Sequence, residues 1–195
     1  MNRTVRWGLA LALLPLAACA DTKPPAPPAP PPAPPPIAAN DASFIQTAAQ
    51  GGMAEVQMGQ LADSTSHSKA IKAFAEKMVS DHTANDDQLK QLVTAKGGTV
   101  PTTLGDDQQA MLTKLQGEHG HKFDHDYLQG QIQGHQAMLS AFQTEASSGT
   151  DPDVKNFATQ TIPTIQMHLD RAKALAGMGG MHHHHMMHHP KADAS

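Results

Sequence analysis

An internal repeat restricts the fold of this chain more than any other feature of its sequence. Identical or similar residues recur at a constant offset of 83 positions, without a gap, from Phe44 and Tyr127 to Leu92 and Leu175. Single matches arise by chance, whereas one offset held over so long a stretch indicates a duplicated unit. The matched pairs are Phe44/Tyr127, Ile45/Leu128, Gln50/Gln133, Gly51/Gly134, Ala54/Ala137, Ile71/Val154, Lys72/Lys155, Phe74/Phe157, Ala75/Ala158, Asp87/Asp170, Lys90/Lys173 and Leu92/Leu175.

Each half of the repeat is predicted to form two helices. The repeat region is rich in Ala, Gln, Leu, Met and Lys, and aromatic residues make up only 4% of the chain, a composition that favours helix. Asn40 or Asp41 is the expected N-cap of the first helix, and Gly97-Gly98 the stop of the second. We expect long helices at about residues 41–62, 68–95, 121–146 and 152–177, and a short extra helix at about 106–116.

A duplicated helical hairpin with a long middle connection predicts an all-α fold. Two hairpins joined by one long crossover form the ferritin-like four-helix bundle. We therefore expect residues 40–177 to form such a bundle, with the short extra helix in the crossover.

The segment before the bundle is expected to direct the protein to the cell envelope and to anchor it to a membrane. Arg3 and Arg6 precede an apolar run too short to span a bilayer, which predicts a signal peptide over residues 1–18. The run ends in Leu-Ala-Ala-Cys19, which resembles a bacterial lipobox and implies lipidation of Cys19, with a chance cysteine as the alternative. Residues 19–39 would then be the lipidated cysteine and a proline-rich linker, in which Pro24 to Pro36 form a polyproline II spacer of about 40 Å. This arrangement implies a periplasmic protein whose membrane contact is a lipid anchor in the outer membrane.

Charge and motif content exclude several classes of function. The chain has 14 basic and 18 acidic residues, and cleavage before Cys19 removes Arg3 and Arg6, which leaves a formal charge of −6. Nucleic acid is therefore not an expected partner, because phosphate binding needs a basic face. The sequence has no glycine-rich phosphate loop and no Gly-x-Ser-x-Gly nucleophile motif, so we expect no organic cofactor and no hydrolase or nucleotide enzyme.

Several motifs in the bundle region resemble one bacterial family. They are Gln50-Gly51-Gly52-Met53-Ala54-Glu55, Phe74-Ala75-x-x-Met78-Val79-x-Asp81-His82-Thr83, Phe123-Asp124-x-x-Tyr127, Gln133-x-His135 and Pro163-Thr164-x-x-x-His168-Leu169. Over residues 41–176 the chain is similar to the bacterial "predicted outer membrane protein" family, a ferritin-like domain of unknown function 4142. The resemblance implies the ferritin-like fold and an envelope location, and it supplies no agreed activity or protein partner.

The C-terminal tail, residues 178–195, is rich in metal-binding side chains and is expected to be disordered. The chain has 13 histidines, and six of them lie in the tail with two adjacent methionines. Imidazole suits Cu(II), Ni(II) and Zn(II), and thioether suits Cu(I). The methionine interruption and the residues that follow speak against a purification tag, which is the alternative. The predicted ligands are His182, His183, His184, His185, Met186, Met187, His188 and His189.

Each long helix of the bundle also carries one polar residue within or near its apolar stripe. These residues are Glu55, His82, His135 and His168, and together they would make a His3Glu-like metal site if their heights along the bundle matched. The alternative is that they are buried polar residues that hydrogen-bond to each other, to backbone carbonyls or to water. The Glu-x-x-His pairs of di-iron proteins are absent, because Val79 and Ile165 stand three residues before two of these histidines.

A third candidate site lies at the start of the predicted helix 121–146. His121 and His125 are four residues apart, so both imidazoles point the same way and could chelate one ion. The alternative is an exposed polar helix start.

Three functions remain compatible with the sequence. The first is an envelope protein that binds or sequesters Cu, Ni or Zn through the tail. The second is a structural or stress-related lipoprotein that binds a protein partner. The third is a redox enzyme with a metal inside the bundle. The sequence ranks them in this order and therefore favours a protein that is not an enzyme.

Overall fold

The structure, a computed structural model, describes residues 36–186, with side chains as far as Gly177. Within that range the chain forms five helices and no strand, so the predicted all-α class is confirmed. The elements are α1 (Ala39–Thr65), α2 (Lys69–Ala95), α3 (Asp106–Gln116), α4 (Gly120–Ser148) and α5 (Pro152–Met186).

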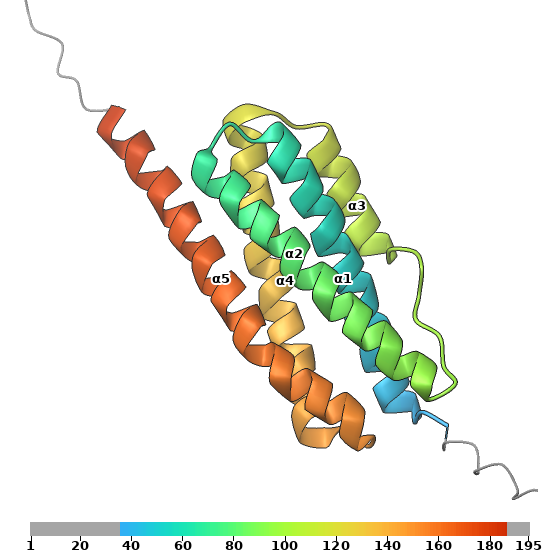
Figure 1. Cartoon of the computed structure of the whole chain (residues 1–195). Coiled ribbons are helices and arrows are strands. Elements are labelled where there is room, and N and C mark those ends of the chain that lie inside the picture. The colour runs from blue at the N-terminus through green and yellow to red at the C-terminus, as the bar shows by residue number, and fades with distance from the viewer. Residues whose placement is uncertain (1–35, 187–195) are drawn as a thin grey trace, which may run out of the picture. The chain divides into compact units, whose positions relative to one another are not determined.

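The helices are arranged as a four-helix bundle with one long crossover (Figure 1). The hairpins α1–α2 and α4–α5 are joined by the connection that contains α3, and this connection returns along the bundle before α4 begins. Besides the contacts within each hairpin, α1 packs against α4, α2 against α5, and α3 against α1 and α4. The ferritin-like bundle, with a short helix in the crossover, is thus the arrangement predicted from the repeat.

Aromatic contacts between the hairpins follow the internal repeat. Phe44 of α1 lies 6.4 Å from Phe157 of α5, measured between ring centres. The residues at the offset of 83 are Tyr127 of α4 and Phe74 of α2, and their ring centres are 6.3 Å apart. Because each pair joins one hairpin to the other, the two halves exchange equivalent contacts. The duplication seen in the sequence is therefore also present in the packing.

The start of α1 differs from the prediction. The helix begins at Ala39, its N-cap residue is Ala38, and no side chain caps it. Asp41, an expected cap, is fully buried inside the first turn, where its carboxylate accepts hydrogen bonds from the backbone N–H groups of Thr150 (2.7 Å) and Asp151 (2.9 Å). An aspartate that accepts hydrogen bonds from the unpaired N–H groups at the start of a helix stabilises that end of the helix. Asp41 therefore ties the first helix to the beginning of α5 instead of capping its own helix.

The end of the last helix also differs from the prediction. We expected it near Gly177, whereas α5 runs to Met186. A glycine inside a helix costs only about 1 kcal/mol relative to alanine and does not by itself end the helix. Residues 1–35 and 187–195 lie outside the described range, as do all side chains beyond Gly177. The signal peptide, Cys19, most of the spacer and the ligands of the tail therefore remain predictions. None of the described helices combines the length and the hydropathy needed to cross a membrane.

Candidate metal centre

Three of the four polar residues predicted from the helical stripes meet in the middle of the bundle. His82 lies on α2, His135 on α4 and His168 on α5, and their exposed fractions are 4%, 0% and 1%. One imidazole nitrogen from each lies within 4.8 Å of the other two. Among the described residues this is the one group of three or more potential ligands of this kind. The heights of the three histidines along the bundle therefore match.

The histidines form a polar layer between two apolar clusters of the core. One cluster includes Met78 of α2 and Ala172 of α5, and the other includes Leu89 of α2 and Ile165 of α5. His82 and His168 lie between these positions in the sequence, so each helix passes from one cluster to the other through its histidine. The apolar surroundings exclude water from most of the layer, which makes any unpaired polar atom there costly.

The three imidazole rings have nearly equal spacings. Their centres are 5.6 Å apart for His82 and His135, 5.3 Å for His82 and His168, and 5.4 Å for His135 and His168. An ion bound 2.0–2.1 Å from each nitrogen would place the ring centres roughly 5.2–5.5 Å apart, for angles between tetrahedral and trigonal. The ring positions thus already fit a shared ion. Rotation of the side chains would be enough to bring the nitrogens to the distance of roughly 3.3–3.6 Å that such a site needs.

Hydrogen bonds hold one ring nitrogen in two of the three histidines. Nδ1 of His135 donates to the backbone carbonyl of Gln131 (2.9 Å), and Nε2 of His168 donates to the carboxylate of Asp81 (2.8 Å). The opposite atoms, Nε2 of His135 and Nδ1 of His168, are buried and have no hydrogen-bond partner, and the same holds for Nε2 of His82. Metal-bound histidines in proteins usually show this pattern, in which the second nitrogen is held by a carbonyl or a carboxylate.

Two histidines of this layer, His82 and His168, favour the neutral form that a metal ion requires. Burial, together with the neighbouring His135 and His168, lowers the pKa of His82 to about 3, although Asp81 acts in the opposite direction. Burial also lowers the pKa of His168, although the hydrogen bond to Asp81 acts in the opposite direction. A neutral imidazole keeps a lone pair on its unprotonated nitrogen, so both residues can act as ligands at neutral pH.

Glu55, the fourth predicted ligand, is buried close to the histidines, but its carboxylate lies next to Gln131 and Nδ1 of His135. Its Oε2 accepts a hydrogen bond from Gln131 (2.6 Å), and its Oε1 lies 3.7 Å from Nδ1 of His135, the nitrogen that donates to the carbonyl of Gln131. Burial raises the pKa of Glu55, although His135 and Gln131 act in the opposite direction. The structure therefore places Glu55 behind one histidine and outside the group of ligand atoms.

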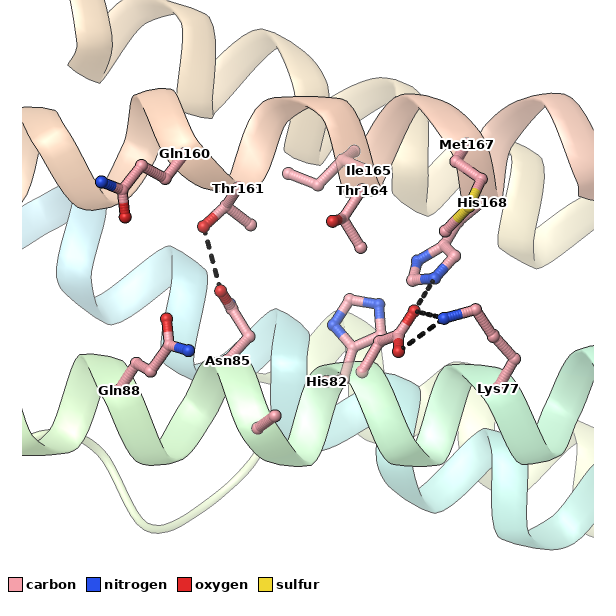
Figure 2. Close-up of a pocket in the computed structure, with 12 residues that line it drawn as sticks. Lys77, His82, Asn85, Gln88, Gln160, Thr161, Thr164, Ile165, Met167 and His168 are labelled. Atoms are coloured by element: carbon pink, nitrogen blue, oxygen red, sulfur yellow. Dashed lines mark hydrogen bonds and ion pairs between the residues drawn. The ribbon is translucent and has the colours of Figure 1, made fainter.

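A groove between α2 and α5 leads from the surface to this layer. It has a volume of about 380 Å³, and its lining includes His82, His168, Asn85, Thr161 and Thr164. Figure 2 shows His82 from α2 and Thr164 and His168 from α5 directed into the space between the two helices. Thr161 and Asn85 are hydrogen-bonded across the groove at 3.0 Å, in line with the dashed contact in the figure. The groove gives small solutes a path to two of the three histidines.

Sequence reasoning found the histidines but missed some of their partners. Gln131, which contacts both Glu55 and His135, was not predicted, although its position four residues before His135 on the same helix face is a usable signal. Asp81 joins α2 to α5 through its hydrogen bond with His168. Met167 is 45% exposed and lines the groove.

The structure gives less support to the two other predicted metal sites. His121 and His125 are exposed in the first turns of α4, and Nδ1 of His125 contacts Asp126 at 2.8 Å. They belong to no group of three potential ligands among the described residues. The eight tail ligands lie beyond the described side chains.

Comparisons with known proteins give a family and a fold. Residues 26–175 match the family model described as a domain of unknown function, DUF4142. A comparison with curated proteins found no match. A crystal structure of a DUF305 fragment from Deinococcus radiodurans is similar with a TM-score of 0.66 and 14% identity, over 74% of this chain and 99% of that one. A conserved hypothetical protein from Mycobacterium tuberculosis is similar with a TM-score of 0.57 and 13% identity, over 80% and 96% of the two chains. At these identities the similarity shows the helical fold alone.

Proposed function

This chain belongs to the DUF4142 family, a domain of unknown function, and from that premise we propose that it binds a transition-metal ion inside its bundle. His82, His135 and His168 are the ligands. Two observations support this: one ring nitrogen of each residue lies within 4.8 Å of one from each of the other two, and each ring has a buried nitrogen with no hydrogen-bond partner. Each unsatisfied nitrogen costs roughly 1–3 kcal/mol. A single bound ion would satisfy all three.

The donor set favours Zn, Cu or Ni. Three neutral imidazoles suit these ions, whereas di-iron centres need several carboxylates. Asp81 accepts a hydrogen bond from Nε2 of His168, and Glu55 lies 3.7 Å from Nδ1 of His135, so these two carboxylates would act as supporting groups. The metal is therefore held by histidine, with the carboxylates orienting the rings from behind.

The sequence outside the bundle supports an envelope role for this metal binding. The signal peptide, the lipidation motif at Cys19 and the resemblance to the "predicted outer membrane protein" family favour a periplasmic lipoprotein. The tail ligands, His182 to His189, would collect ions near the membrane as a second binding segment. In this proposal the bundle retains one ion tightly, and the tail binds further ions weakly.

Metal titration of the full-length chain tests the proposal. The reference is a tail-neutral variant, in which all six tail histidines are replaced by serine, and it is titrated with Zn, Cu and Ni. We expect it to retain one ion per chain, because the bundle ligands are intact. Adding His135→Ala should remove that ion, whereas adding His67→Ala, which changes an exposed histidine, should not.

The competing functions predict other results. If all binding disappears with the tail histidines, the bundle is a passive scaffold for a sequestering tail. If neither the intact chain nor the tail-neutral variant binds metal, the bundle centre is refuted, and a structural protein that binds a partner becomes the better account.

A further inference from the structure

The proposed metal centre offers three protein ligands, and we infer that a small anion, hydroxide included, takes the fourth position by entering the groove between α2 and α5. This inference rests on the proposed function. It adds the class of ligand that the bound metal accepts and the path by which that ligand arrives.

In the observed conformation, neither Glu55 nor Asp81 is placed to fill the fourth position. Glu55 lies 3.7 Å from Nδ1 of His135, whereas Nε2 of that ring is the buried atom without a hydrogen-bond partner. Asp81 is bonded to Nε2 of His168, whereas Nδ1 of that ring is the unpartnered atom. Among the described residues the ligand group has three members. Sites with three protein ligands and one open position are those at which zinc binds water or substrate.

The groove has room for such a ligand at the metal centre. Its volume of about 380 Å³ is many times the share of one water molecule, about 30 Å³ in the liquid. His82 and His168 are part of its lining, so the groove reaches the proposed ligands themselves. Thr164 adds a hydroxyl group, which can donate a hydrogen bond to an anion.

The charge balance of the centre favours an anion over a neutral molecule. The three imidazoles contribute no charge when they bind a metal. Asp81 is already paired with Lys77, whose ammonium group lies 2.7 Å from its carboxylate. Even an ionised Glu55 would cancel only one of the two charges of a divalent ion. A net positive charge therefore remains at a buried position, and an anion from the groove would reduce it.

Cobalt(II) provides a spectroscopic test, with azide as the anion. The tail-neutral full-length chain is loaded with one equivalent of Co(II), and its visible d–d spectrum is recorded during titration with azide. We expect a saturable spectral change. Thr164→Phe should weaken azide binding by about tenfold or more, because the ring fills the groove, while Co(II) affinity stays unchanged. Ala84→Phe is the second groove variant, since Ala84 lines the groove and is exposed. Thr159→Phe, on the exposed side of α5, is the matched control and should bind azide normally.

The outcomes separate this inference from the proposed function. If Co(II) binds and azide leaves its spectrum unchanged, the fourth position is closed, and the inference fails while metal binding stands. If azide binds equally well to both groove variants, the entry path is refuted. If no Co(II) binds to the tail-neutral chain, the proposed function fails, and this inference fails with it.

Discussion

Replacing His135 by leucine should stabilise the metal-free bundle and abolish its response to metal. His135 is fully buried, and its Nε2 has no hydrogen-bond partner. If His135 serves the packing of the core, its replacement should lower the stability of the protein. If it serves metal binding, its replacement should raise the stability of the metal-free protein. The substitution therefore separates the two explanations that the sequence alone left open.

The magnitude follows from the contacts of this side chain. Removing the unsatisfied Nε2 gains roughly 1–3 kcal/mol, and losing the bond from Nδ1 to the Gln131 carbonyl costs about 0.5–1.5 kcal/mol. That carbonyl keeps its helical partner, the backbone N–H four residues later, so it is not left unsatisfied. The net gain is about 0.5–1.5 kcal/mol. For a bundle of this length it should raise the Tm of the metal-free protein by about 2–7 °C.

Thermal unfolding measured by circular dichroism, with a chelator and then with one equivalent of Zn, checks this prediction. The tail-neutral chain should melt at a higher temperature with Zn, because a ligand that binds only the folded state stabilises it. The His135→Leu variant should not respond. Met138→Leu, in the adjacent apolar cluster, is the control and should keep the response. A loss of more than about 1 kcal/mol in the chelator-treated His135→Leu variant would show that the histidine is a structural residue and refute the reasoning.

Three further predictions follow from other contacts. Asp81→Asn keeps an acceptor for His168 but removes the charge, so metal affinity measured by calorimetry should fall about 10–100-fold; unchanged affinity would remove Asp81 from the centre. Burial, together with the charge of Asp41, raises the pKa of Glu145 from 4.5 to about 7. The folded protein thus holds this proton more tightly than the unfolded chain, and stability is lost as pH rises from about 4.5 through 7. Glu145→Gln should therefore raise the Tm relative to the unsubstituted chain at pH 8 and not at pH 4.5, and an equal effect at both would contradict this. Gly59→Ala should lower stability by about 1–3 kcal/mol in urea despite a better helix propensity, because its Cβ would lie 2.8 Å from Val79; a gain in stability would show that α1 and α2 can move apart.

The architecture was predictable because the sequence contains the helical hairpin twice. The offset that matches Phe44 with Tyr127 and Phe74 with Phe157 is also the relation between the two cross-hairpin aromatic contacts. A duplicated hairpin with a long connection allows few arrangements, so the bundle followed from periodicity and loop length. The helix boundaries were less predictable. Asp41 looked like a cap for its own helix, but a contact distant in the sequence, with the start of α5, determines its role.

The candidate site was predictable in its members more than in its geometry. His82, His135 and His168 stood out as polar residues in apolar stripes, and the structure brings them together. Glu55 met the same criterion, yet its carboxylate is directed to Gln131 and to the far side of His135. Spacing along a helix gives the face of a residue but not the rotamer of its side chain. The orientation of a carboxylate within the core therefore required the structure.

The central claim is that His82, His135 and His168 hold one ion in common. X-ray absorption spectroscopy of the tail-neutral chain, loaded with one equivalent of Zn, tests it most directly. The account predicts about three imidazole ligands at about 2.0–2.1 Å and one further oxygen or nitrogen donor at a similar distance. The imidazole signal should weaken when any one of the three histidines is replaced. A spectrum with fewer than two imidazoles, or one that is the same in the His82→Ala, His135→Ala and His168→Ala variants, would contradict it.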